Sequence, residues 1–414
     1  MQAPSHPTLP TRRHTLRWLG AGIGSATLGA CGGGAVLVWG ETPASAASNP
    51  LPVDTQPAVK VAVVTVASGL SRPWALAFLP DGRMLVTERT GALRSVGRDG
   101  KASVPIAGTP AVDARGQGGL LDVTLDPAFA VNRRVYLSYA EAGAGADAGR
   151  NGTAVARGVL STDGTRLSDV QVIFRQTPKI DSTAHFGSRL VFAPDGALFV
   201  TLGDRYSQRD AAQDLSNTLG KVVRIHADGS VSKDNPFAGR AGVREEIWSF
   251  GHRNVQGAAI HPVTGELWTS EHGPQGGDEV NIDRAGRNYG WPRISYGCDY
   301  GAPVGNCPPV GGATSAPGME QPVTYWVPTS IAPCGMAFYT GSLFPQWRGN
   351  LFVGALAGQA LWRLQLDGNR VAAREALLTD LGERIRDVRQ APDGSIHLVT
   401  DGAAGRILRV QPAA

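Results

Sequence analysis

The chain has 414 residues, of which 54 are glycine and 28 are proline, and only 18% are charged. Its formal net charge of +4 excludes the large positive surplus with which nucleic-acid-binding proteins neutralise phosphates. Abundant glycine and proline within a chain that is 42% hydrophobic indicate many short strands joined by tight turns, which argues against a helical bundle or a coiled coil.

Residues 1–47 are typical of an export signal. Arg12 and Arg13 precede a weakly apolar, glycine-containing stretch without charge, as in twin-arginine signals. A membrane-spanning helix is the alternative, supported by length but not by composition. Cleavage could follow the small residues that end at Ala46, or precede Cys31 in a lipoprotein-like box. The protein is therefore predicted to be periplasmic, with membrane attachment only if Cys31 is lipidated.

A strand, a Pro-Asp-Gly type turn and a second strand recur along residues 58–412. Proline presets the turn and glycine closes it, so each copy predicts an antiparallel hairpin. Six unevenly spaced copies argue against a stacked solenoid and predict an all-β fold, a six-bladed β-propeller, with a β-sandwich as the alternative. The turn prolines of the six copies are Pro80, Pro127, Pro194, Pro262, Pro345 and Pro392.

The first strand, residues 59–66, has no hairpin partner of its own. We expect it to complete the last blade beside residues 406–410, which would close the ring and cover both edges. Residues 141–189, 202–258 and 271–336 are expected to be long irregular connections, where functional sites commonly lie.

Polar residues gather in these long segments. His185 and Asp204 flank one hairpin, so a carboxylate could orient an imidazole for general base catalysis, although a structural hydrogen bond is the alternative. Residues 252–256 combine a histidine, an arginine and two amides, which could equally be a hydrogen-bonded loop. Residues 271–281 combine carboxylates with a Gly/Pro turn, a mixture that suits Ca²⁺, with helix capping or loop solvation as the alternative.

Three cysteines follow the export signal. Cys298 and Cys307 stand in a short Gly/Pro-rich segment, and we predict that they form a disulfide in an oxidising compartment. Cys334 is then left as a buried free thiol.

Seven segments in one order resemble the soluble quinoprotein glucose/sorbosone dehydrogenases, and among them the bacterial periplasmic aldose sugar dehydrogenases that use pyrroloquinoline quinone (PQQ). The resemblance covers about residues 60–410. It implies a six-bladed propeller with PQQ over its axis, and oxidation of the C1 hydroxyl of aldoses to aldonolactones. Electrons would pass to a periplasmic acceptor, a cytochrome or the quinone pool. The segments are residues 116–122, 185–190, 202–205, 251–257, 271–281, 288–292 and 383–388.

The resemblance also implies catalytic roles. His185 would be the base that removes the proton from the anomeric hydroxyl while hydride passes to PQQ. Asp204 would hold the imidazole, and Arg253 would stabilise the negative charge that develops on the reduced quinone oxygen.

Cofactor and metal ligands follow from the same resemblance. One Ca²⁺ would be held by the carbonyls of Gly273 and Pro274 together with PQQ, and a second by Glu279 and the carbonyl of Tyr289. The side chains implied to bind PQQ are Gln117, Arg253, Asn254, Gln256, Tyr300, Arg384 and Arg386.

The chain departs from the family pattern at two positions. Ala357 stands where some relatives have a lysine that contacts PQQ, which leaves room for Gln359 or Arg363. Cys334 stands where a serine is usual, so a thiol is expected near the cofactor.

Two other functions fit part of the pattern. A calcium-dependent lactonase on a six-bladed propeller would use the histidine, the aspartate and Ca²⁺, but would have no use for Arg384 and Arg386. A non-catalytic propeller with a degenerate site would not need the intact set of His185, Asp204 and Arg253.

Overall fold

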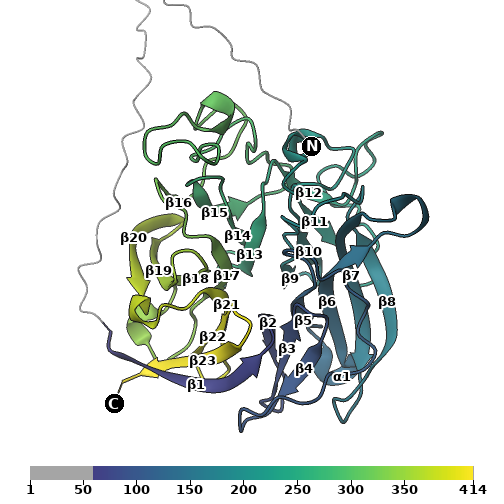
Figure 1. Cartoon of the computed structure of the whole chain (residues 1–414), viewed down its shortest axis with the longest axis vertical. Coiled ribbons are helices and arrows are strands. Elements are labelled where there is room, and N and C mark those ends of the chain that lie inside the picture. The colour runs from purple at the N-terminus through teal and green to yellow at the C-terminus, as the bar shows by residue number, and fades with distance from the viewer. Residues whose placement is uncertain (1–58, 414) are drawn as a thin grey trace, which may run out of the picture. The chain divides into compact units, whose positions relative to one another are not determined.

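Six antiparallel sheets make up the computed structural model, which describes residues 59–413. The predicted export signal and Cys31 lie outside these residues. Figure 1 shows the innermost strand of each sheet, β2, β5, β9, β13, β17 and β21, around the middle of a ring, with the later strands further out. The predicted six-bladed β-propeller is confirmed. Within residues 59–413, no helix is long and apolar enough to cross a membrane.

The first three blades follow the chain in order, and only the first has three strands instead of four. Blade 1 contains β2 (Pro73–Phe78), β3 (Met84–Glu88) and β4 (Leu93–Val96). Blade 2 contains β5 (Leu120–Leu125), β6 (Arg134–Ala142), β7 (Asn151–Leu160) and β8 (Leu167–Arg175). Blade 3 contains β9 (Leu190–Phe192), β10 (Leu198–Thr201), β11 (Lys221–Ile225) and β12 (Ile247–Phe250).

The last three blades each have four strands. Blade 4 contains β13 (Val255–Ile260), β14 (Leu267–Glu271), β15 (Asp278–Asp283) and β16 (Thr324–Trp326). Blade 5 contains β17 (Pro333–Phe338), β18 (Leu351–Ala355), β19 (Ala360–Asp367) and β20 (Arg370–Leu377). Blade 6 contains β21 (Ile385–Gln390), β22 (Ile396–Thr400), β23 (Gly405–Pro412) and β1 (Val61–Leu70).

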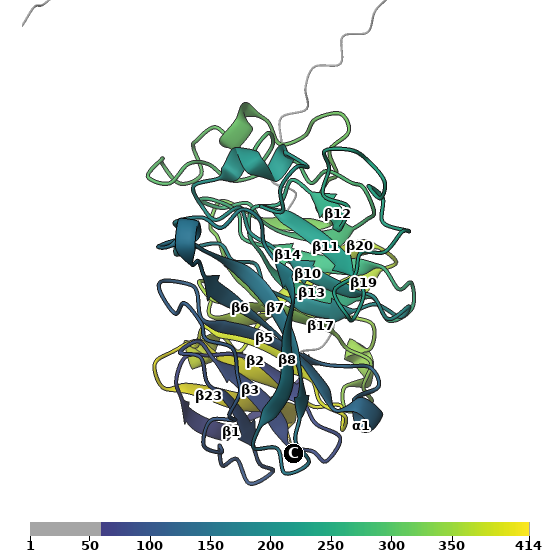
Figure 2. The ribbon, with the colours of Figure 1, turned by 90° about the vertical axis from the view of Figure 1, so that its right-hand side faces the viewer.

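The helices of the described residues are all short. The α-helix α1 (Phe129–Asn132) lies between the first two strands of blade 2. In Figures 1 and 2 the long teal and green connections of blades 3 and 4 extend at the top of the view. The 3₁₀-helices are η1 (Gly145–Asp147), η2 (Arg209–Gln213), η3 (Val310–Gly312), η4 (Pro345–Trp347) and η5 (Thr379–Leu381).

Each predicted Pro-containing turn lies between the first and second strands of a blade, as Pro80 does between β2 and β3. The three long segments expected to be irregular are different. Residues 141–189 contain β7 and β8, residues 202–258 contain β11 and β12, and residues 271–336 contain β15 and β16. That prediction was wrong, because these segments contain the outer strands of blades 2, 3 and 4. In the first of them the Asp163-Gly164 turn joins β7 to β8 and was overlooked as a hairpin signal.

The ring is closed by the two ends of the described chain. Strand β1 pairs antiparallel with β23, with Val61 opposite Pro412 and Val63 opposite Val410. This arrangement confirms the predicted closure, and it covers an edge that would otherwise be free to pair with another chain. Hydrophobic clusters lie between neighbouring blades; one joins Trp268 of blade 4 to Phe338 and Val353 of blade 5.

A β-bulge recurs near the start of the inner strand in five of the six blades. In blade 1, Pro73 is opposite Glu88 while Ala75 is opposite Thr87, so Trp74 is the extra residue. Bulges re-aim side chains and often occur beside active sites. The bulged positions are Trp74, Leu121–Asp122, Gln256, Cys334–Gly335 and Arg386.

A buried ion cluster ties the inner strands together across the axis. Arg189 Nη1 lies 3.1 Å from Asp122 Oδ1 and 2.9 Å from Asp387 Oδ1. Arg389 lies 2.9 Å from Asp122 and 2.8 Å from Asp387. Asp122 and Asp387 also accept hydrogen bonds from the backbone N–H groups of neighbouring inner strands. Two charges of each sign therefore join blades 2, 3 and 6.

Candidate active site at the propeller axis

A cavity of about 300 Å³ lies at the axis. The bulged residues Trp74, Leu121, Gln256 and Arg386 line it, so the bulges turn side chains of four blades toward one space. Arg89, His272, Leu356 and Asp401 also line it, and each of these directly follows the second strand of its blade. Gln117, Phe186, Gly187, Ala332 and Arg384 complete the lining.

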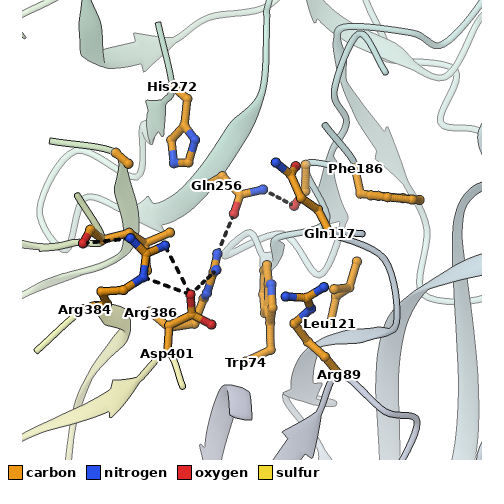
Figure 3. A pocket seen from close by; sticks show the side chains of 13 residues that line it. Trp74, Arg89, Gln117, Leu121, Phe186, Gln256, His272, Arg384, Arg386 and Asp401 are labelled. Carbon is orange, nitrogen blue, oxygen red and sulfur yellow. Dashed lines mark hydrogen bonds and ion pairs between the residues drawn. The ribbon is translucent and has the colours of Figure 1, made fainter. Parts of the chain in front are cut away.

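Positive charge dominates the cavity lining. In Figure 3, Arg384 and Arg386 lie beside Asp401 on one side of Trp74, and Arg89 lies on the other side. Arg386 Nη2 is 3.1 Å and Arg384 Nη2 is 3.3 Å from Asp401 Oδ2. Three guanidinium groups thus face a single carboxylate. Arg386 Nε is buried and has no hydrogen-bond partner within residues 59–413. The cavity is suited to an anionic ligand.

A chain of amides supports these charges. Gln256 accepts a 3.0 Å hydrogen bond from Arg386 Nη1 and donates from Nε2 to the carbonyl of Gly187 at 3.2 Å. Asn254 accepts from the N–H of Gly187 at 3.1 Å. Gln117 accepts from the backbone N–H of His185 at 2.9 Å, so the cavity wall is bonded directly to the predicted base.

His185 and Asp204 meet as predicted from their positions around one hairpin. His185 Nδ1 lies 2.6 Å from Asp204 Oδ1, while Trp291 Nε1 donates to Asp204 Oδ2 at 2.8 Å. The contact through Nδ1 leaves Nε2 of His185 to accept a proton. His185 is 6% exposed, and burial lowers the pKa of its imidazole below the usual value. A neutral imidazole held by a carboxylate is the arrangement that a general base needs.

The backbone holds His185 in a conformation that L-residues seldom adopt. Its φ is +52°, in the left-handed region. Placing a residue other than glycine or asparagine there costs about 1 kcal/mol or more of conformational free energy. The strain is compensated by the hydrogen bonds to Gln117 and Asp204 and by the edge contact with the ring of Tyr206.

Arg253 is buried, with its guanidinium 5.4 Å from the centre of the Trp291 ring. Its Nη1 donates to the carbonyl of His272 at 3.0 Å, and its Nη2 donates to the hydroxyl of Tyr300 at 3.2 Å. Tyr300 itself is 61% exposed. Arg253 lines the smaller cavity described below, whereas Gln117, Gln256, Arg384 and Arg386 line the axial cavity. Asn254 and Tyr300 line neither cavity.

A second, smaller cavity of about 20 Å³ gathers the four predicted metal ligands, Gly273, Pro274, Glu279 and Tyr289. Glu271 lines it as well, and Asn281 Nδ2 donates to both Glu271 and Glu279, at 3.3 and 3.2 Å. Burial and the charge of Glu271 raise the pKa of Glu279. Within residues 59–413, no group of three or more His, Cys, Asp or Glu side chains is arranged to hold a metal.

The turn that carries Gly273 and Pro274 is tightly built. Gly276 and Gly277 have φ of +77° and +70°, and a Cβ on Gly277 would lie 2.2 Å from the backbone nitrogen of Gly297. Asp278 accepts from the N–H of Gly273 at 2.8 Å, and the carbonyl of Pro274 accepts from Ser330 at 3.2 Å. These hydrogen bonds and glycines fix the backbone of the turn with no side chain over it at Gly273, Gly276 and Gly277, so an ion can approach its carbonyls.

The turn is also bonded to the disulfide segment. Gln275 exchanges two backbone hydrogen bonds with Cys298, and Cys298 is joined to Cys307, which confirms the predicted disulfide. The side chain of Gln275 donates to the carbonyl of Ala302 at 2.6 Å. The segment that carries Tyr300 is thereby fixed to the predicted metal turn.

The two departures from the family pattern are placed differently from each other. Ala357 is exposed, and Arg363 is directed away from the cavity, with hydrogen bonds to Glu375 at 2.9 Å and to Asn350 at 2.7 Å. Neither Arg363 nor Gln359 lines the cavity. Cys334 is fully buried, with its sulfur 3.6 Å from Arg386 Nη1, and burial raises the pKa of the thiol to about 11.

The residues of the cavity wall that sequence reasoning missed include Trp74, Arg89, His272 and Asp401. Their common signal is register, because Trp74 is the second residue of an inner strand and the other three directly follow the second strand of a blade. His272 lines both cavities, and burial with the nearby charge of Arg253 lowers the pKa of its imidazole far below the usual value.

Residues 70–409 match the Glucose / Sorbosone dehydrogenase family. The chain belongs to this family. It is similar to the aldose sugar dehydrogenase YliI of Escherichia coli K12, with 47% identity over 353 residues, covering 85% of this chain and 93% of the relative.

Two solved structures extend the likeness to the fold. The soluble aldose sugar dehydrogenase of Escherichia coli in its apo-form is 47% identical, covers 86% of this chain and 100% of its own, and superposes with a TM-score of 0.81. The PQQ-bound aldose sugar dehydrogenase of Streptomyces coelicolor is 30% identical, covers 86% of this chain and 99% of its own, and has a TM-score of 0.70. With this family match and these aldose sugar dehydrogenase relatives, the chain is a sugar dehydrogenase on a propeller, an oxidoreductase.

Proposed function

We propose that the protein is a PQQ- and Ca²⁺-dependent aldose dehydrogenase that oxidises the C1 hydroxyl of aldoses to aldonolactones. The observation that carries the proposal is the buried His185–Asp204 pair at the edge of a cationic cavity. A base next to an anion-binding cavity is what the removal of a hydroxyl proton beside a tricarboxylate quinone requires. A lactonase would have no use for the cations.

The cavity residues fit PQQ by their chemistry. PQQ carries three carboxylates on a flat ring system, and when bound it supplies a quinone that accepts two electrons as a hydride. Arg384 and Arg386 would hold carboxylates, and the unpartnered Nε of Arg386 is a donor available for one. Gln117, Asn254 and Gln256 would fix the edge of the ring.

The smaller cavity fits Ca²⁺ by its oxygens. Glu279 accepts from a neutral amide, Asn281, and no cationic side chain of the described residues is hydrogen-bonded to it. Carboxylate and carbonyl oxygens are the ligands that Ca²⁺ prefers. The carbonyls of Gly273 and Pro274 would bind one Ca²⁺. Glu279 and the carbonyl of Tyr289 would bind a second. Ca²⁺ would supply a Lewis acid beside the quinone.

Three side chains of the protein would act in the reaction. His185 takes the C1 hydroxyl proton on Nε2, while Asp204 fixes the tautomer through Nδ1 and stabilises the imidazolium that forms. Arg253 would place a permanent charge beside the quinone oxygen on which negative charge develops. Its guanidinium is fixed by the carbonyl of His272 and by the hydroxyl of Tyr300.

Electrons would pass from the protein to an acceptor on the periplasmic side, either a cytochrome or the quinone pool. Export by the twin-arginine route is part of the same proposal, because that route carries folded proteins. It rests on residues 1–47 alone, and fusing that segment to a reporter checks it.

Reconstitution tests the proposed function. The purified mature chain would be stripped with EDTA and titrated with PQQ and Ca²⁺ in the presence of glucose and a dye acceptor. We expect dye reduction only when both PQQ and Ca²⁺ are present, with Mg²⁺ a poor substitute because it demands a smaller octahedral site. No reduction with any common aldose would refute the proposal, and lactone hydrolysis without PQQ would favour the hydrolase.

The pH dependence of kcat/KM should report His185. Since burial lowers its pKa, the neutral base persists to lower pH, and we expect the acid limb below pH 6.5, the ordinary value for histidine. The hydrogen bond to Asp204 raises this pKa, so Asp204→Asn should move the limb further toward acid as well as lower the plateau. A limb that moves toward neutral pH in Asp204→Asn would contradict the assignment.

A further inference from the structure

Arg89 lines the axial cavity and has no carboxylate partner among the described residues, 59–413. It directly follows β3 in blade 1 and lines the axial cavity beside Trp74 and Leu121, as Figure 3 shows. Its Nε donates to the carbonyl of Gly118 at 3.2 Å, and its Nη2 donates to the carbonyl of Gly116. Its Nη1 has no hydrogen-bond partner among residues 59–413, which leaves one donor of a fixed, half-buried guanidinium for a ligand.

The other cations of the cavity are arranged differently. Arg384 and Arg386 share Asp401, at 3.3 and 3.1 Å, and stand across Trp74 from Arg89. Asp401 therefore offsets one of the three positive charges, and its hydrogen bonds go to the other two arginines. Of the three cations, Arg89 is the one whose guanidinium has no hydrogen bond to a carboxylate of residues 59–413.

The placement of Arg89 bears on the missing lysine of blade 5. Ala357 supplies no charge, and Arg363 is engaged by Glu375 and Asn350 away from the cavity. A positive charge that blade 5 does not supply is present on blade 1. Like-charged guanidiniums around one cavity cost free energy unless an anion is bound between them.

We propose that Arg89 is the third cationic anchor of the cofactor, binding a carboxylate of PQQ through Nη1. The inference rests on the proposed function and deepens it. The two backbone hydrogen bonds fix the guanidinium in advance, so little side-chain entropy is lost when the anion binds.

The test is the affinity for PQQ in the presence of Ca²⁺, measured by the quenching of tryptophan fluorescence, since Trp74 lines the cavity. We expect Arg89→Gln to raise the Kd by about 10- to 100-fold, the size of a lost charged hydrogen bond. Arg89→Lys keeps the charge but not the two carbonyl contacts of Nε and Nη2. We therefore expect it to bind within about tenfold of the parent chain.

Arg98→Gln is the matched control. Arg98 also belongs to blade 1 and donates Nε and Nη2 to one backbone carbonyl, that of Asp81, at 3.0 and 2.6 Å, but it does not line the axial cavity. Its substitution should leave the Kd unchanged.

Three outcomes overturn the inference, and they are distinguishable. Parental affinity in Arg89→Gln would show that the residue does not contact the cofactor. Equal losses in Arg89→Gln and Arg89→Lys would show that Arg89 acts by supporting residues 116–118. Absence of PQQ binding by the parent chain would refute the proposed function itself.

Discussion

Replacing His185 by alanine should lower kcat for aldose oxidation by about 10²- to 10⁴-fold, the usual contribution of a general base. PQQ binding should be retained, because His185 does not line the axial cavity and its hydrogen bond to the wall residue Gln117 comes from its backbone N–H. Dye reduction under saturating glucose measures kcat, and fluorescence titration measures the Kd for PQQ. Asp204→Asn should also lower kcat, since the imidazole loses the carboxylate that fixes its tautomer.

His261→Gln is the matched control for this prediction. His261 is a half-buried histidine whose ring accepts hydrogen bonds from the N–H groups of Val263 and Thr264, in the turn after β13. Its substitution should leave both kcat and the Kd unchanged. Turnover at the parental rate in His185→Ala would mean that another group removes the proton.

The substitution Asp122→Asn should destabilise the fold by about 3–5 kcal/mol. Asp122 is fully buried and balances Arg189 and Arg389 at 3.1 and 2.9 Å. Its loss leaves the buried guanidinium of Arg189 and the half-buried one of Arg389 with one carboxylate, Asp387. Urea unfolding followed by circular dichroism measures the change in the free energy of unfolding.

Two further variants make this test specific to the cluster. Asp367→Asn breaks an exposed pair with Arg370 and should change the free energy of unfolding by less than about 1 kcal/mol. Adding Arg389→Met to Asp122→Asn restores the charge balance and should recover part of the loss. If Asp122→Asn unfolds like Asp367→Asn, the ion cluster does not hold the blades together.

The inner half of every blade could be predicted because its signal is local. Pro80 and Pro392 each stand in a Pro-Asp-Gly turn between two strands, and the turn chemistry alone identifies the hairpin. The pairing of β1 with β23 was also predictable. The first strand has no hairpin partner, and the last blade of a closed ring offers it an open edge. The outer strands β11 and β12 were not, since residues 226–246 connect them in place of a tight turn.

The candidate site divides in the same way. His185 and Asp204 flank one hairpin, and Cys298 and Cys307 share one segment, so proximity along the chain indicated both contacts. The cavity wall is built from contacts between distant residues: Gln256 and Arg386 are 130 residues apart.

Arg89 was missed because the cavity wall forms only when distant residues come together. Its role also depends on how many carboxylates face the arginines of the cavity. An arginine after a strand is ordinary in a sequence. It becomes informative when Arg384 and Arg386 are seen to share Asp401, and Arg89 to have backbone contacts alone.

At the recurring bulges, the residues that line the axis are not the ones that pair the strands. A bulged residue has no counterpart on the neighbouring strand, so Trp74, Gln256 and Arg386 can be exchanged without mispairing the strands that flank them. Together with Leu121 and Cys334 they give one bulged position in each of five blades. New ligand preferences could therefore arise by single substitutions at the axis while the blades retain their packing, and a library restricted to these positions is the most economical way to redesign the protein.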